Sequence, residues 1–209
     1  MRVLGIDEAG RGCVLGALVI GGFIAEDVDD ETLRAAGAAD SKTMTHAKRL
    51  AARIKLAELG TADVRLVSPK QIDNGNLNTL EEEVIVDLVR TWKPDLVLVD
   101  ALGHPSTIPR TIARLQSQVG VEIRPKWTME PKADHTYPTV GAASIFAKTT
   151  RDGLLEDVRE TYGDFGSGYP SDPKTRTWIT SWAKTRKPWP PIVRTRWQTI
   201  VDLAQQALF

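Results

Sequence analysis

The sequence predicts an α/β fold in which a mixed β-sheet is flanked by helices and followed by a small helical appendage. Two strand-like apolar runs come first, helical periodicity then alternates with short apolar runs, and a proline-rich segment at 187–191 separates the last helices. Initial strands followed by alternating helix and strand are typical of α/β layers. We expect residues 1–170 to form the main domain. Residues 171–209 should pack on it, because so short a piece rarely folds alone.

Strands are expected where apolar runs end at polar or turn-forming residues. The runs at 4–6 and 15–24 are joined by a glycine-rich segment, which favours a hairpin with a tight turn. Further strands are expected at 64–67, 96–99 and 121–124. The run at 96–99 is apolar throughout, as expected for a strand buried on both faces.

Helices are expected where apolar residues recur at intervals of three and four. The first should cover 45–59, with Thr45 as its N-cap and Gly60 after its last turn. Its predicted apolar face consists of Ala47, Leu50, Ala51, Ile54 and Ala57. The other predicted helices lie at 79–92, 109–118, 137–162, 173–183 and 195–208.

Composition indicates a chain with one sizeable core and no membrane partner. There are 209 residues, 42% of them hydrophobic, and no run approaches the ~20 consecutive apolar residues that span a bilayer. Met1 leads directly into a strand-like segment without an apolar signal region. Cys13 is the single cysteine, so it has no partner for an internal disulfide. We expect a cytoplasmic protein, and a monomer because no heptad pattern indicates association.

Positive charge is concentrated near the C-terminus, although 27 basic and 27 acidic residues make the whole chain neutral. Residues 170–196 contain seven basic residues against one acidic residue, a net charge of +6. Such a segment can attract phosphate, or it can be an ordinary solvated surface. Charge alone leaves both interpretations open.

Acidic residues stand where two predicted strands end. Asp7 and Glu8 follow the first strand, and Asp100 ends another. Strand ends in open α/β sheets commonly carry ligand sites, and clustered carboxylates repel one another unless a cation binds. Mg²⁺ suits a few carboxylates completed by water and substrate phosphate, and two such ions can clamp a phosphodiester.

Other interpretations of these acids remain open at this point. Asp100 alone could be a turn residue, and Asp7-Glu8 could pair with Arg11. For a fourth acid the residues leave Asp134 and Asp152 open, although Asp152 shares a predicted helix face with Lys148 and could simply pair with it. Residues 5–12 do not fit a Gly-x-Gly-x-x-Gly dinucleotide-binding motif, and acids stand where phosphate should approach.

Residues 5–12 resemble the opening signature of type 2 ribonucleases H, the ribonuclease HII family. Seven further blocks follow in the family's order: Asp40-Ser41-Lys42, Asn76-Leu77-Asn78, Val99-Asp100-Ala101, Lys132-Ala133-Asp134, residues 142–148, Arg151-Asp152 and Gly166-Ser167-Gly168-Tyr169-Pro170. The resemblance covers about residues 3–197. The last block and the compact length are most similar to the archaeal branch, and Gly10-Arg11-Gly12 argues against the type 3 relatives.

The resemblance implies a ribonuclease H-like fold and a metal-dependent endonuclease. Such an enzyme hydrolyses the RNA strand of RNA/DNA hybrids and nicks duplex DNA on the 5′ side of single ribonucleotides, leaving 5′-phosphate and 3′-hydroxyl ends. It implies two-metal-ion catalysis with Mg²⁺ or Mn²⁺ held by Asp7, Glu8, Asp100 and Asp134. It thereby favours Asp134 over Asp152. A non-catalytic duplex-binding protein would be expected to lack one or more of these acids.

The resemblance also implies substrate contacts. The family's turn, here Gly10, Arg11 and Gly12, touches the ribonucleotide through backbone groups, which fits because the 2′-OH distinguishes RNA from DNA. Tyr169 corresponds to a tyrosine that packs on the neighbouring sugar, and Lys42 and Lys148 are candidate phosphate contacts.

Two positions differ from the family pattern or match it only weakly. Cys13 stands where the family often has proline. Residues 205–209 are faintly similar to a sliding-clamp-binding peptide that has lost its paired aromatics.

Overall fold

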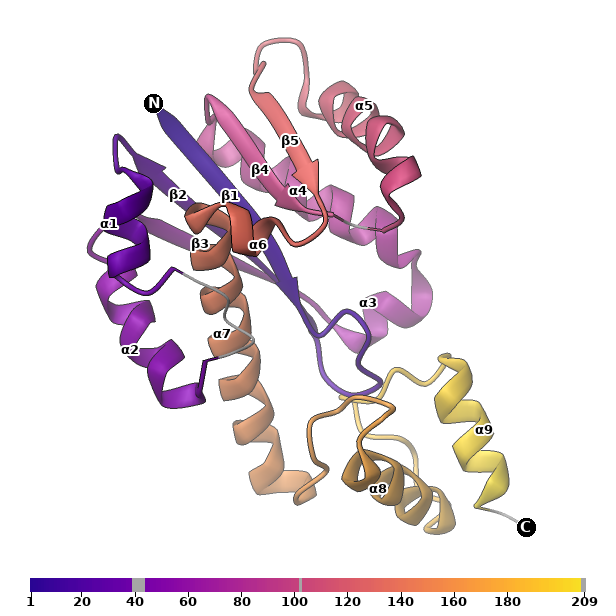
Figure 1. Ribbon diagram of the computed structural model, residues 1–209. Helices are drawn as coiled ribbons and strands as arrows, with labels where there is room; N and C mark the ends of the chain where they lie inside the picture. The colour runs from indigo at the N-terminus through magenta and orange to yellow at the C-terminus, as the bar shows by residue number, and fades with distance from the viewer. Residues whose placement is uncertain (39–43, 102, 208–209) are drawn as a thin grey trace.

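The central sheet mixes antiparallel and parallel strands and lies between two layers of helices (Figure 1). The computed structural model describes residues 1–38, 44–101 and 103–207. Within them the sheet has five strands in the order β3-β2-β1-β4-β5. Their bounds are β1 Arg2–Ala9, β2 Leu18–Glu26, β3 Thr61–Val67, β4 Leu96–Asp100 and β5 Lys126–Glu130. The β3-β2-β1 pairings are antiparallel and the β1-β4-β5 pairings are parallel, which confirms the predicted mixed sheet.

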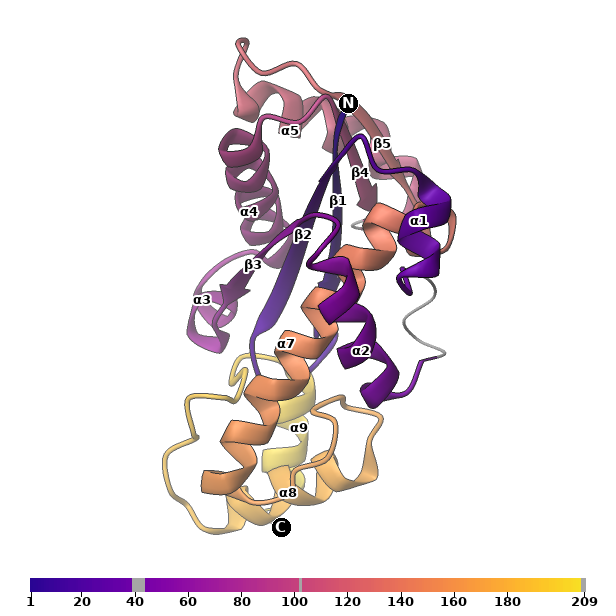
Figure 2. The same cartoon turned by 90° about the vertical axis from the view of Figure 1, so that its left-hand side faces the viewer.

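Helices cover both faces of the sheet, as Figure 2 shows from the side. One face carries α3 (Pro69–Asn74), α4 (Leu77–Trp92) and α5 (Ile108–Val119), with the short η1 (Pro105–Thr107) before α5. The other face carries α1 (Asp30–Ala35), α2 (His46–Leu56), α6 (Ala133–Thr136) and α7 (Pro138–Tyr162). Separate apolar clusters fill the two sides, one around Leu4, Ile6 and Leu88 and the other around Phe23, Ala143 and Phe146.

Glycines in the central strands let α7 lie directly on the sheet. A Cβ atom at Gly5 would lie 2.3 Å from the backbone carbonyl of Thr139, and one at Gly21 would lie 2.4 Å from the carbonyl oxygen of Ala143. Any larger residue at these two positions would push the helix away. The close approach fixes the position of the first half of α7 relative to β1, and this matters for the site described below.

The C-terminal appendage packs on the lower end of α7 and on the loop between β1 and β2. It contains α8 (Pro173–Lys184) and α9 (Gln198–Gln206) and lies at the end of the sheet opposite Met1 (Figure 1). Its apolar core joins Ile179 and Leu203 of the appendage to Leu155 of α7 and Val14 of the loop. The division of the chain at residue 170 stays a prediction.

The strand predictions need two corrections. The connection between β1 and β2 is not a tight turn but a loop covering residues 10–17, and Leu15 forms an isolated antiparallel bridge with Val193. The strand predicted at 121–124 is wrong, because that segment is a turn and β5 begins at Lys126. Val121 is 78% exposed, whereas β5 buries Met129 beside β4.

The helix at 45–59 forms, but its predicted buried face is wrong. Thr45 caps α2 as expected, accepting a hydrogen bond from the backbone N–H of Lys48. Leu50 and Ile54, however, are 42% and 68% exposed. The helix instead turns Ala52, Leu56 and Arg53 toward α7, and the Arg53 guanidinium lies 4.9 Å from the Phe146 ring. Long arginine stems can cover apolar surface in this way.

The remaining long helices form, although α9 begins at Gln198, three residues later than predicted, and position 208 of that prediction lies outside the described residues. α4 begins at Leu77, two residues earlier than predicted, because the Asn76 side chain caps its first turn. The short helices α1, α3 and α6 were not predicted.

Close packing at the sheet predicts opposite effects for two glycine-to-alanine changes. Gly21→Ala should destabilise the protein by about 1–3 kcal/mol, since its methyl group would press on a backbone carbonyl that cannot swing aside. Gly153→Ala is the matched control inside α7, where nothing lies within 4 Å of the new atom. It should stabilise by roughly 0.5–1 kcal/mol through helix propensity. Urea unfolding midpoints test both, and a wild-type midpoint for Gly21→Ala would contradict the packing argument.

Candidate active site

Three of the predicted acids meet at one end of the sheet. Ile6 of β1 is in parallel register with Val99 of β4, so Asp7 and Asp100 are the next residues of two neighbouring strands. They line a cleft of about 430 Å³. The predicted site residues on its wall are Asp7, Glu8, Gly10, Arg11, Gly12, Asp100, Lys148 and Tyr169. Lys42 lies outside the described residues.

Burial and the charges of neighbouring carboxylates disfavour ionisation of Asp7 and Glu8. Asp7 is only 5% exposed, and burial raises its pKa to about 6, with the charge of Asp100 acting in the same direction. A hydrogen bond from Ser144 and the charge of Lys148 offset part of this. The pKa of Glu8 is raised well above its usual value by burial and then by Asp7. A cation in this cleft would relieve the repulsion.

Asp134 is placed close to the same strand end by α6. The backbone N–H of Ala133 donates to Oδ1 of Asp100 at 3.0 Å, which holds the start of α6 against the end of β4. The Asp134 side chain is 1% exposed and is not among the described residues lining the cleft. The nearest nitrogen of His135 lies 3.8 Å from Oδ1 of Asp134.

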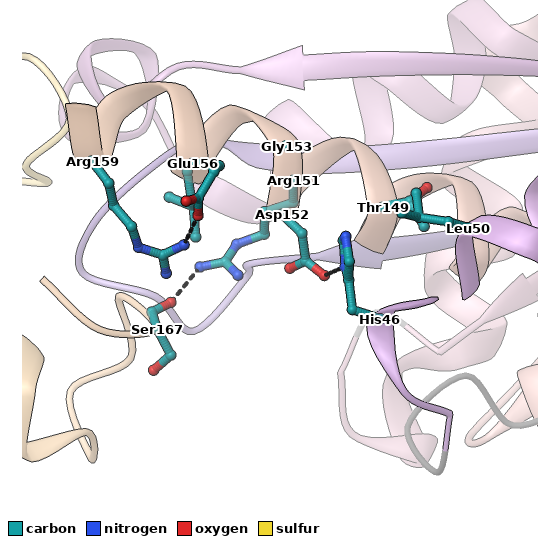
Figure 3. A pocket seen from close by; sticks show the side chains of 10 residues that line it. His46, Leu50, Thr149, Arg151, Asp152, Gly153, Glu156, Arg159 and Ser167 are labelled. Carbon is teal, nitrogen blue, oxygen red and sulfur yellow. Dashed lines mark hydrogen bonds and ion pairs between the residues drawn. The ribbon is translucent and has the colours of Figure 1, made fainter. Parts of the chain in front are cut away.

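Asp152, the alternative fourth acid, is held by two basic side chains. Its Oδ2 lies 3.0 Å from Nη2 of Arg49 and 3.2 Å from Nδ1 of His46. The suggested pairing with Lys148 is therefore not its main contact, and the Lys148 ammonium donates to Ser144 at 2.8 Å. Asp152 lines the same cleft as Asp7, Glu8 and Asp100, and it also lines a larger neighbouring cleft of about 660 Å³ (Figure 3).

The carboxylates supply the oxygen donors that Mg²⁺ and Mn²⁺ prefer. Among the described residues, no three His, Cys, Asp or Glu side chains are already gathered as a finished metal site. Asp7, Glu8 and Asp100 nevertheless share one cleft wall, and the raised pKa values of Asp7 and Glu8 show the electrostatic strain that a divalent ion would remove. The donor set therefore fits such an ion.

The Gly10-Arg11-Gly12 turn offers its backbone to the cleft, because the arginine side chain is engaged elsewhere. Nε of Arg11 donates to the carboxylate of Glu81 at 2.9 Å, and its Nη2 donates to Asn78. Glu81 is fully buried. Gly10 has a φ of +85°, and a Cβ atom there would lie 2.6 Å from Nε of Arg151. Glycine is therefore required at this position.

Tyr169 lies beside this turn and is tied to it through Arg151. A Cβ atom at Gly12 would lie 3.8 Å from the Tyr169 ring. The Arg151 guanidinium lies 5.4 Å from the ring centre, and its Nη2 donates to Sγ of Cys13 and to the carbonyl of Ser167, both at 2.9 Å. The last of these contacts is also visible in Figure 3. Burial raises the pKa of Tyr169 to about 12.

Two charged residues that are part of the site were not predicted from the sequence. Glu81 sits in a helix where it looks like an ordinary surface acid, yet it is fully buried against Arg11. Arg194 belongs to the basic segment expected to contact phosphate or solvent, but it too is fully buried. Only the contacts of the folded chain reveal either role.

Comparison with known proteins identifies the family of the chain. The model of the family Ribonuclease HII matches residues 4–200. Ribonuclease HII of Pyrococcus horikoshii is 41% identical, over 95% of this chain and 91% of that protein. This chain belongs to the ribonuclease HII family. As a member, it is a metal-dependent ribonuclease H, and its similarity to archaeal members confirms the predicted branch.

Solved structures confirm the ribonuclease H-like fold. The ribonuclease H2 of Pyrococcus horikoshii OT3 superimposes with a TM-score of 0.89 at 38% identity, covering 100% of this chain and 99% of that one. Bst-RNase HIII, solved with Mn²⁺, gives a TM-score of 0.78 at 16% identity, covering 99% of this chain and 70% of that chain. This second likeness shows the fold alone. In the described part of this ribonuclease HII, no helix is long and apolar enough to cross a membrane.

The raised pKa of Asp7 predicts that removing its charge stabilises the metal-free enzyme. The folded-state pKa of about 6 exceeds the ordinary value of 3.8, so folding becomes less favourable as pH rises through this window. Asp7→Asn should therefore be more stable than wild type at pH 8 in EDTA, by roughly 1–3 kcal/mol, and the difference should vanish near pH 4.

Denaturant unfolding at the two pH values measures this effect. Asp152→Asn is the control, because it loses contacts with Arg49 and His46 and should be less stable than wild type at pH 8. A destabilised Asp7→Asn protein at pH 8 would show that Asp7 is not under electrostatic strain.

Proposed function

We propose that this enzyme hydrolyses the RNA strand of RNA/DNA hybrids and nicks duplex DNA on the 5′ side of a single ribonucleotide. The observation that carries the proposal is the juxtaposition of the acid cluster with the backbone of the Gly10-Arg11-Gly12 turn in one cleft. The acids suit phosphodiester hydrolysis, and a tight backbone turn suits recognition of a 2′-OH. Membership of the ribonuclease HII family supports both parts.

In this proposal Asp7, Glu8, Asp100 and Asp134 hold two Mg²⁺ or Mn²⁺ ions. When bound, the ions supply an activated water and charge stabilisation for the leaving 3′ oxygen, which gives 5′-phosphate and 3′-hydroxyl ends. Asp134 is preferred over Asp152 because Asp152 already has two basic partners, whereas Asp134 follows the residue that is bonded to Asp100.

The remaining residues position the substrate. Tyr169 is 39% exposed at the cleft and can pack on the sugar next to the ribonucleotide. Lys148, on the same wall, and Lys42 are proposed phosphate contacts. The exposed basic side chains of the 170–196 segment, among them Arg176, Lys184 and Lys187, can attract the duplex through its phosphates.

A sliding clamp is proposed as a protein partner. The relative from Archaeoglobus fulgidus, solved as a PCNA:RNase HII complex, has a TM-score of 0.86 at 35% identity over 96% of each chain. The last described helix, α9, ends at Gln206. This residue is the second of the segment 205–209, which is faintly similar to a clamp-binding peptide. Monomeric state and cytoplasmic location stay predictions.

Cleavage of an end-labelled DNA duplex with one ribonucleotide tests the proposed site. We expect a Mg²⁺-dependent nick on the 5′ side of the ribonucleotide, abolished by EDTA. Asp100→Asn and Asp134→Asn should lower the rate by more than ~100-fold, beyond the ~10–100-fold typical of groups that only support a metal ligand. Asp152→Asn should lower the cleavage rate by less than either of these two changes. Near-normal activity of Asp134→Asn with an inactive Asp152→Asn would reverse the assignment of the fourth ligand.

Tyr169 should contribute more to cleavage at a single ribonucleotide than to cleavage of a long hybrid. At a single ribonucleotide, the position of the cut depends on the contact of the Tyr169 ring with one neighbouring sugar. Tyr169→Ala should reduce cleavage of the single-ribonucleotide duplex about tenfold more than that of a long hybrid, equivalent to ~1.4 kcal/mol of ring packing. Tyr169→Phe keeps the ring and serves as the control. Equal losses of Tyr169→Ala on both substrates, measured as kcat/KM, would remove the proposed role.

A further inference from the structure

Arg194 connects the C-terminal appendage to the loop that forms one wall of the active-site cleft. It is the largest fully buried side chain of the described residues, at 0% exposure. Its Nη2 donates to the carbonyl oxygen of Gly10 at 2.7 Å, its Nη1 to that of Arg11 at 2.9 Å, and its Nε to that of Gly16 at 3.1 Å. Each guanidinium nitrogen therefore holds a backbone carbonyl of the β1–β2 loop.

These bonds, together with one from the Cys13 N–H to the Gly10 carbonyl oxygen at 3.2 Å, fix which way the neighbouring N–H groups face. A peptide bond is planar and trans, so the C=O of one residue and the N–H of the next point in opposite directions. Holding the carbonyls of Gly10 and Arg11 turns the N–H groups of Arg11 and Gly12 away from Arg194. In the described part of the chain neither N–H donates to another group, and both residues line the cleft.

A buried cation also strengthens these donors. Hydrogen bonds in a chain polarise one another, so a carbonyl that accepts from a guanidinium belongs to a peptide whose N–H donates more strongly. Burial lowers the pKa of Arg194 to about 10, which leaves the guanidinium charged at neutral pH. The Trp197 ring, 4.9 Å from the guanidinium carbon, supports it from the appendage side.

We propose that Arg194 is a positioning residue for ribonucleotide recognition, which orients the Arg11 and Gly12 amides toward the substrate. The proposal rests on the proposed function of the Gly10-Arg11-Gly12 turn and adds the group that sets its conformation. Arginine suits the role because its rigid planar fork can reach three carbonyls at once, whereas lysine presents one flexible point charge.

The appendage has other anchors, so the role of Arg194 can be tested without losing them. The backbone N–H of Arg194 donates to Val14 at 3.0 Å and that of Gly16 donates to Ile192 at 2.7 Å. The carboxylate of Asp73 in α3 accepts from the N–H and hydroxyl of Thr195, both at 2.7 Å. None of these bonds uses the guanidinium.

The experiment compares Arg194→Met and Arg194→Lys with Leu203→Ala. Leu203 is 4% exposed in the apolar core of the appendage, and its truncation weakens the appendage without touching the turn. Each variant is assayed below its own unfolding transition. Affinity is measured with Ca²⁺ in place of Mg²⁺ for a single-ribonucleotide duplex and for the all-DNA duplex of the same sequence. Amide chemical shifts of Arg11 and Gly12 are recorded without substrate.

We expect Arg194→Met to reduce the preference for the ribonucleotide duplex about tenfold, the equivalent of one or two lost hydrogen bonds. It should also move the two amide shifts. Arg194→Lys should fall between Arg194→Met and wild type, and it carries the test if Arg194→Met does not fold. Leu203→Ala should keep both the preference and the shifts.

The Arg194 variants could lose stability as Leu203→Ala does, yet keep the wild-type preference for the ribonucleotide duplex and unmoved amide shifts. That result would overturn the proposal and leave Arg194 a structural residue. A wild-type enzyme with no preference for the ribonucleotide would instead contradict the proposed function. In that case the amide shifts still decide whether Arg194 orients the turn.

Discussion

The parallel pairing of β1 with β4 brings Asp7 and Asp100 to the same end of the sheet, where their carboxylates repel. Helix α7 lies directly on the strands at Gly5 and Gly21, which places Ser144 and Lys148 next to Asp7. The hydrogen bond from Ser144 and the charge of Lys148 both favour the ionised form of Asp7. These groups offset only part of the strain. A site that stays strained without metal and relaxes with it binds the ion strongly, since relief of repulsion adds to the binding free energy.

In the proposed function the acids supply the chemistry, and a second unit positions the substrate. The β1–β2 loop, the Tyr169 loop and the appendage meet around two arginines. Arg151 joins the turn to the Tyr169 loop, and Arg194 joins it to the appendage. A segment 183 residues beyond Arg11 in the chain thereby holds the backbone at the start of the site. The appendage helices supply none of the proposed metal ligands, so their contribution to the site is this contact with the turn.

The fold could be predicted from local patterns wherever those patterns reflect burial on a single element. Asp7 and Asp100 were placed at strand ends because an apolar run stops at each. Apolar periodicity failed for α2, since the stem of Arg53 covers Phe146 and leaves Leu50 and Ile54 in solvent. It also failed at Leu15, whose partner is Val193 rather than a neighbouring strand residue.

The site residues, like the strands and helices, could be predicted only where a local sequence pattern marks them. Asp134 could be preferred over Asp152 only through the family resemblance, because nothing local shows that Asp152 meets Arg49 and His46. The role of Arg194 could not be found from sequence at all. A buried guanidinium and an exposed one look alike until the carbonyls of Gly10, Arg11 and Gly16 are placed around it.

The most direct test of the central claim is anomalous diffraction at the manganese edge from crystals of this enzyme soaked in Mn²⁺. We predict peaks bounded by the carboxylates of Asp7, Glu8, Asp100 and Asp134, with Asp152 still paired to Arg49 and His46. Manganese bound at Asp152, or its absence from the end of β1 and β4, would contradict the claim that the strained carboxylates form the metal site.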